Sequence, residues 1–137
     1  MYDPRIVQPM RQDLTSAGFQ ELLTPEDVDT VFKGQSGTLL CVVNSVCGCS
    51  AGGARPGVKL ALNGAKRPNK LTTVFAGQDR EATERARTYF AGYPPSSPAI
   101  ALLKDGQVAF MLERQDIEGF SADQIAAKLK TAFEELC

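Results

Sequence analysis

The sequence predicts a single α/β domain in which helices flank a mixed four-stranded sheet. Segments with helical apolar periodicity alternate with short β-rich segments, a pattern typical of parallel strands joined by a helix. Two further β-rich runs flank Asp105-Gly106, the dipeptide favoured in two-residue hairpins, so the last two strands are expected to be antiparallel. The 137 residues, of which 43% are hydrophobic and 23% charged, are enough for one buried core.

The N-terminal segment, residues 1–35, is expected to form a helical extension to a core at residues 38–137. Apolar side chains recur at helical spacing over residues 5–17, and Gly18 follows as a stop. A second, shorter helix is expected in TPEDVDTVFKG, where the threonine can cap the first turn and the proline suits the first helical position. The two helices therefore precede the sheet.

The central part of the chain predicts a strand–helix–strand–helix unit. The run TLLCVVN (38–44) is continuously apolar and β-rich, as expected of a strand buried on both faces. A helix is expected to follow and to end near Gly64, although its glycines and Pro56 weaken the pattern. LTTVFA (71–76) is the next strand, and DREATERARTYFAG (79–92) is the next helix.

The end of the chain predicts a β-hairpin and a closing helix. AIALLK and QVAFML form the hairpin, and SADQIAAKLKTAFEEL begins with Ser121 and Gln124 at capping-box spacing. A right-handed crossover makes the first two strands parallel. This order predicts a single thioredoxin-like domain with an N-terminal helical extension, and it places Cys47 where the first strand leads into a helix.

Composition excludes several classes of function. The net charge of -1 comes from 15 basic and 16 acidic residues that are mixed along the chain, so neither nucleic acid nor an anionic membrane is an expected partner. No run approaches the roughly 20 apolar residues of a membrane span, and the N-terminus lacks an apolar leader, so a cytoplasmic location is expected. The absence of histidine excludes Cys–His nucleophilic pairs and mixed Cys/His zinc sites.

The candidate catalytic residues lie in VNSVCGCSAGGARPG, where Cys47 and Cys49 flank Gly48. Backbone N–H groups at the start of a helix favour thiolate over thiol, so Cys47 is expected to be the nucleophile and Cys49 its neighbour or resolver. A disulfide between them would close a tighter ring than a Cys-x-x-Cys pair and would be easily reduced. Gly48 can supply the backbone angles of this turn, which Asn44 and Ser45 can pin by hydrogen bonds.

Two other interpretations of the cysteines remain open. The pair could be inert core thiols, or it could bind a metal by recruiting Cys41 and Cys137 to complete four ligands. Cys41 lies within an apolar strand and is expected to be a buried small hydrophobe. Cys137 is expected in solvent at the end of the last helix. Redox chemistry without a metal is therefore the favoured interpretation.

A second element supports substrate binding near the cysteines. Pro98 directly precedes a strand expected beside the strand that leads to Cys47. In thioredoxin-like proteins a cis-proline here packs against the active cysteine, and the backbone of the preceding residue, here Ser97, pairs with the substrate chain. Arg55 could attract an anionic thiol or could be an ordinary surface arginine. Ser97, Pro98, Gly48 and Arg55 are thus the expected substrate-binding residues.

The stretches MYDPRIVQPMRQDLTSAGFQELLT, VNSVCGCSAGGARP, LTTVFAGQDREAT and YPPSSPAIALLKDG resemble the bacilliredoxin family of low-GC Gram-positive and related bacteria. The resemblance extends over essentially the whole chain. It implies a thioredoxin-like enzyme that removes bacillithiol, a low-molecular-weight thiol with malate carboxylates, from proteins that carry it as a mixed disulfide. Cys47 would attack the S-bacillithiolated client protein and retain bacillithiol.

The same resemblance implies the rest of the cycle. Free bacillithiol or Cys49 would resolve the intermediate, and a flavoprotein bacillithiol-disulfide reductase would recycle the product. No bound cofactor is expected, because bacillithiol is the co-substrate. Cys41 stands where thioredoxins keep a buried acid, so a monothiol cycle through an external thiol is favoured. A general protein disulfide isomerase or reductase, and a non-catalytic thiol-binding or metal-binding module, remain alternatives.

Overall fold

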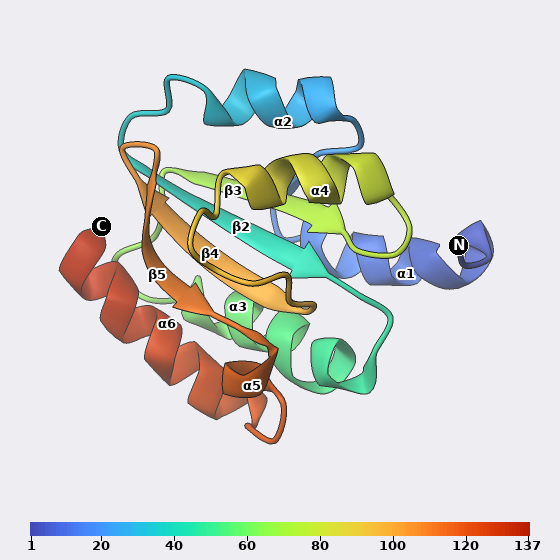
Figure 1. Cartoon of the computed structure of the whole chain (residues 1–137). Coiled ribbons are helices and arrows are strands. Elements are labelled where there is room, and N and C mark those ends of the chain that lie inside the picture. The colour runs from blue at the N-terminus through green and yellow to red at the C-terminus, as the bar shows by residue number, and fades with distance from the viewer.

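The computed structural model describes residues 1–137, in which helices cover both faces of one sheet (Figure 1). The element order is α1 (Pro4–Thr15), β1 (Gln20–Glu21), α2 (Pro25–Phe32), β2 (Thr38–Asn44), η1 (Ser50–Ala54), α3 (Arg55–Ala61), β3 (Lys70–Phe75), α4 (Arg80–Thr88), β4 (Ala99–Lys104), β5 (Gln107–Leu112), α5 (Arg114–Ile117) and α6 (Ala122–Leu136). The element η1 is a π-helical turn that leads directly into α3. None of the helices is long and apolar enough to cross a membrane.

The sheet has five strands in the order β1-β3-β2-β4-β5. As predicted, β2 is parallel to β3, β4 lies beside β2, and β4 and β5 form an antiparallel hairpin. Strands β2 and β4 are antiparallel. The predicted strand number of four is wrong, because the two-residue strand β1 pairs in parallel with the outer edge of β3. A strand of two residues has no detectable periodicity. The N-terminal extension therefore contributes to the sheet as well as to the helices.

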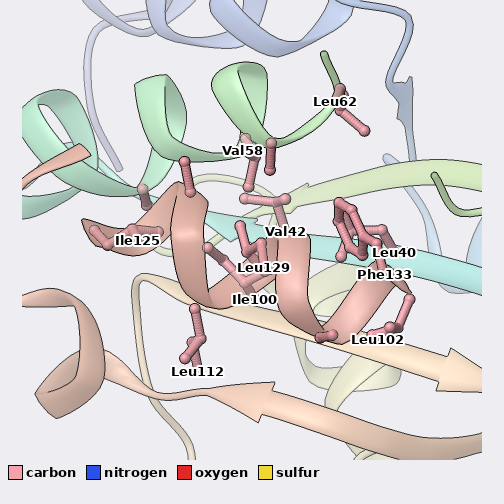
Figure 2. Close-up of a cluster of buried hydrophobic side chains, with 14 of the residues drawn as sticks. Leu40, Val42, Val58, Leu62, Ile100, Leu102, Leu112, Ile125, Leu129 and Phe133 are labelled. Carbon is pink, nitrogen blue, oxygen red and sulfur yellow. The ribbon is translucent and has the colours of Figure 1, made fainter. Parts of the chain in front are cut away.

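The central strand β2 is buried on both faces, as predicted. All seven of its residues are buried, and alternate side chains point to opposite sides of the sheet. Leu40 and Val42 pack with Val58 of α3 and with Leu129 and Phe133 of α6 (Figure 2). The other face of β2 packs with α2 and α4 in a second apolar cluster. Both layers hold β2 in place, and with it the turn that follows its last residue.

The helical segment of η1 and α3 approaches α6 closely because two of its glycines, Gly53 in η1 and Gly57 in α3, face that helix. A Cβ atom on Gly57 would lie 2.7 Å from Ile125 Cγ2, and one on Gly53 would lie 3.0 Å from Ile125 Cδ1. The predicted helix is therefore confirmed, and the glycines that weakened its pattern permit its packing. This contact fixes the helical segment that follows Cys47 against the core.

Gly57→Ala is expected to lower the free energy of unfolding by about 1 kcal/mol, because overpacking against Ile125 exceeds the gain in helix propensity. Gly52→Ala is the matched control, since nothing lies within 4 Å of a Cβ atom at that position. That variant is expected to be as stable as the parent or slightly more stable. Urea unfolding measures both changes, and equal losses at the two positions would contradict the contact with α6 as the cause.

Helix α1 is attached to the core by polar side chains. Arg11 Nη1 lies 2.7 Å from Asp79 Oδ2 and 2.9 Å from Glu21 Oε2, and all three side chains are mostly buried.

The residues before α1 are also bonded to the core. The backbone N–H of Tyr2 donates to Gln78 Oε1 at 2.8 Å, and Gln78 Nε2 donates back to Tyr2 O at 3.1 Å. Val7 and Leu14 supply the buried apolar face of α1. The extension therefore packs firmly on the domain at the end of β3.

Candidate active site

Cys47 lies in the turn between β2 and the helical segment of η1 and α3, as predicted (Figure 1). The backbone N–H groups of Ser50 and Ala51 donate to Cys47 O at 3.1 and 3.2 Å, so the first helical turn begins at this cysteine. Cys47 and Cys49 are both partly exposed, and both are free thiols. The site therefore presents two reduced sulfur atoms at the surface, on a turn held by the buried strand β2.

The two sulfur atoms differ in acidity. Burial alone would raise the pKa of Cys47, but hydrogen bonds from Cys49, from the Ser45 hydroxyl and from backbone N–H groups outweigh it and lower the pKa below its ordinary value. The Sγ atoms of Cys47 and Cys49 are 2.6 Å apart, and Ser45 Oγ donates to Cys47 Sγ at 3.3 Å. Burial and the neighbouring Cys47 charge raise the pKa of Cys49. Cys47 is therefore the more acidic thiol of the pair.

Ser45→Ala is expected to raise the pKa of Cys47 and to slow alkylation of Cys47 at pH 7 by about tenfold, because a hydrogen bond to a charged group is lost. Alkylation requires the thiolate, so the pH profile of iodoacetamide labelling moves to higher pH. Mass spectrometry of the Cys47 peptide measures this profile. Ser45→Thr keeps the hydroxyl and is expected to stay close to the parent. An unchanged profile in Ser45→Ala would contradict the role of the hydroxyl.

A buried hydrogen-bond network centred on Asn44 holds the turn that carries Cys47. Asn44 Oδ1 accepts from Ser45 N at 2.9 Å, from Ser50 Oγ at 3.1 Å and from Arg55 Nη1 at 3.0 Å. The predicted pinning of the turn by Asn44 is confirmed. The Nδ2 atom of the same side chain donates to Met10 O of α1 at 3.1 Å. The turn that carries Cys47 is therefore connected to both α3 and α1.

The expected position of Arg55 at the surface is wrong. Its side chain is only 4% exposed, because its guanidinium bonds inward: Nη1 donates to Ser45 O at 2.9 Å and Nε donates to Asp13 Oδ2 at 3.1 Å. A guanidinium with these partners supports the turn and is not available to attract a ligand from solvent. The sequence alone did not reveal this, because its partner Asp13 lies in α1, far from Arg55 along the chain.

The cis-proline prediction is confirmed, since the Ser97–Pro98 peptide bond is cis. The register of β2 and β4 places Ala99 opposite Val43, so Pro98 lies beside the end of β2 that leads to Cys47. Pro98 is buried and Ser97 is partly exposed. The structure therefore brings the cis-proline loop and the CGC turn to the same end of the sheet.

Sequence reasoning missed Arg114, the first residue of α5. Arg114 Nη1 donates to Ser97 O at 3.2 Å, and its backbone N–H donates to Ser96 Oγ at 2.6 Å. Its charge acts to lower the pKa of Cys49, against the larger effects of burial and the Cys47 charge. No local pattern marks this arginine, because its relation to the cysteines and to Ser97 exists only in the folded chain.

The remaining cysteines lie apart from the pair. Cys41 is fully buried in β2, which confirms the expected buried position, and burial raises its pKa to about 12. Cys137 is exposed after α6, also as expected. The chain contains no group of three or more histidine, cysteine or acidic side chains placed to hold a metal ion. The chemistry available at the site is therefore that of Cys47 and Cys49.

Comparison with known proteins agrees with this site. A family model described as "Disulphide isomerase" matches residues 2–137. A bacilliredoxin of Bacillus cereus is 57% identical over 132 residues, which cover 96% of this chain and 91% of the relative. A bacilliredoxin of Koribacter versatilis is 53% identical over 137 residues, which cover 100% of this chain and 94% of the relative. The similarity therefore includes the N-terminal extension.

Solved structures identify the fold. Mitochondrial thioredoxin 3 from Saccharomyces cerevisiae, in its oxidized form, matches with a TM-score of 0.57 and 16% identity over 90% of this chain and 99% of that chain. A thioredoxin from Malassezia sympodialis matches with a TM-score of 0.55 and 17% identity over 87% and 90%. From the acidic CGC cysteine, the thioredoxin-like fold and these full-length relatives we conclude that the chain belongs to the bacilliredoxin family of thiol-disulfide oxidoreductases.

Proposed function

We propose that this enzyme removes bacillithiol from S-bacillithiolated proteins by nucleophilic attack of Cys47. The observation that carries the proposal is the asymmetry of the pair: the pKa of Cys47 is lowered while that of Cys49 is raised. A thiolate at neutral pH is the attacking species in thiol–disulfide exchange. The bacilliredoxin relatives supply the identity of the small thiol.

The first step is an exchange in which no net oxidation occurs. The Cys47 thiolate attacks the bacillithiol sulfur of the client's mixed disulfide, a bond forms between Cys47 and bacillithiol, and the client cysteine leaves as a thiolate. Ser97 and the cis Pro98 support binding of the client chain in extended form beside the site.

The second step uses a second bacillithiol molecule. Its thiolate attacks the bacillithiol sulfur on Cys47, which releases bacillithiol disulfide and restores the Cys47 thiolate. A flavoprotein reductase would then return bacillithiol disulfide to two thiols at the expense of its own electron donor. Attack by Cys49 is disfavoured, because burial raises the pKa of Cys49 and Cys41 is not a base at neutral pH. The monothiol route is therefore preferred.

The test compares two adducts on one client protein. The client carries either bacillithiol or glutathione on the same cysteine, and intact-mass spectrometry follows loss of the adduct in the presence of the enzyme. The bacillithiol adduct is expected to disappear at least about tenfold faster than the glutathione adduct. Equal rates would contradict a preference for bacillithiol and would favour a general reductase.

The match to the family described as "Disulphide isomerase" supports a second candidate function, isomerisation of protein disulfides. Cys47 would attack a non-native disulfide and later leave when another client thiolate displaces it, so no external electrons are consumed. Refolding of a client with scrambled disulfides, without bacillithiol, tests this activity. Refolding at the uncatalysed rate would exclude it.

A further inference from the structure

An open groove lies beside the cis-proline loop. It has a volume of about 390 Å³ and is lined by Pro94, Pro95 and Ser96 from the loop and, from α5 and the residues that flank it, by Glu113, Arg114, Gln115 and Glu118. Helix α5 lies at the same end of the sheet as the turn that follows β2 (Figure 1). The loop wall of the groove leads directly into Ser97 and Pro98, Arg114 on the other wall interacts electrostatically with Cys49 and Cys47, and nothing in the cycle described above uses the groove.

Arg114 is the cation that faces this groove. Its side chain is 50% exposed, and its Nη1 atom donates to Ser97 O, the backbone proposed to bind the client. Its charge also acts on both catalytic sulfur atoms, which in turn raise the pKa of Arg114 after the larger effect of Glu118. Arg55, the arginine that the sequence suggested for an anionic ligand, is buried and occupied. Of these two arginines, Arg114 is therefore the one available to bind an anionic ligand.

Arg114 already holds a carboxylate. Its Nε atom lies 2.8 Å from Glu118 Oε2, one helical turn further along, and the Glu118 side chain is 59% exposed. Exposed pairs of this kind are weak, because water competes for both charges. Arginine has five donors in a planar fork that matches carboxylate geometry, so the guanidinium can bind a second carboxylate or exchange its partner.

We propose that Arg114 and the groove beside it form a binding subsite for the carboxylates of the low-molecular-weight thiol, and that Glu118 occupies Arg114 when no such thiol is bound. The proposal rests on the function proposed above and names the part of bacillithiol that this subsite recognises, its malate carboxylates. Because Arg114 contacts the ligand directly, it determines which small thiol the enzyme prefers. Glu118 competes with the ligand and reduces its affinity.

The test uses one client protein that carries, on the same cysteine, either bacillithiol or the uncharged thiol 2-mercaptoethanol. For Arg114→Gln, kcat/KM for removing bacillithiol is expected to fall about tenfold more than kcat/KM for removing mercaptoethanol, mainly through a higher KM for the bacillithiol adduct. Glu118→Gln is expected to raise kcat/KM for the bacillithiol adduct only. Arg67→Gln, at an exposed arginine in the loop after α3, is the matched control and is expected to leave both rates unchanged.

Each result has a separate meaning. An equal loss for both adducts in Arg114→Gln would overturn the subsite, because it would show that Arg114 acts only by holding Ser97 or by tuning the sulfur atoms. Unchanged removal of bacillithiol in Arg114→Gln would also overturn it. If the parent enzyme does not remove bacillithiol above the uncatalysed rate, the proposed function fails, and this is seen before any variant is compared; if the parent removes both adducts equally fast, the subsite alone fails.

Discussion

Cys47→Ala is expected to reduce removal of bacillithiol from a client protein by roughly a thousandfold or more, to the uncatalysed rate. The variant lacks the one sulfur atom whose pKa is lowered, and burial still raises the pKa of Cys49, so Cys49 is a poor replacement. Intact-mass spectrometry of client and enzyme follows the adduct. Transfer to Cys49 at the parental rate would show that the roles of the two cysteines are reversed.

Cys49→Ala separates attack from resolution. Bacillithiol is expected to move onto Cys47 and to remain there until free bacillithiol is added. The hydrogen bond from Cys49 is the largest of the contributions that lower the pKa of Cys47, so this variant also needs a higher pH to reach its maximal rate. Cys49→Ser keeps a hydrogen-bond donor and is expected to show a smaller change in the pH profile. Cys137→Ser, at the exposed C-terminus, is the control that should behave as the parent.

Arg55→Met is expected to lower the free energy of unfolding by about 2 to 4 kcal/mol, because buried acceptors lose their charged donor. The guanidinium supplies Asn44 Oδ1 and Ser45 O, and it connects α3 to Asp13 of α1. Methionine fills a similar volume without restoring these bonds. The Ser45 hydroxyl then loses its fixed position beside Cys47, so the pKa of Cys47 is expected to rise as well.

Urea unfolding and the pH dependence of Cys47 alkylation measure the two effects of Arg55→Met. The matched control is Arg5→Met, which removes an arginine from an exposed pair with Asp3 on α1. It is expected to change neither stability nor alkylation measurably. If Arg55→Met behaved like Arg5→Met, the network under the turn would contribute nothing to stability or to the acidity of Cys47.

Sequence patterns were sufficient for the elements whose signals are local. The apolar run of β2, the hairpin at Asp105-Gly106 and the capping box at Ser121 each have a physical cause within a few residues, and the structure contains all three elements as predicted. The cis bond before Pro98 followed from its expected place beside the strand that leads to Cys47. These elements fixed the fold class and the location of the cysteine pair.

The features that were not predicted depend on contacts between distant segments. Strand β1 exists because Gln20 and Glu21 meet the free edge of β3, and a two-residue strand has no pattern of its own. Arg55 is buried because Asp13, which is remote in sequence, pairs with it. Arg114 reaches Ser97 only after the hairpin has brought β5 beside β4. Such residues carry no local signal, although they surround the reactive sulfur.

The buried thiol of Cys41 has a consequence for how the enzyme responds to its surroundings. With a pKa of about 12, it neither takes up nor releases a proton at neutral pH, so it cannot assist closure of an internal disulfide as a carboxylate in that position would. In the proposed cycle, completion of each turnover would then depend on an external thiol, and the turnover rate would rise and fall with the concentration of that thiol. The protein would thereby couple repair of oxidised targets to the state of the small-thiol pool.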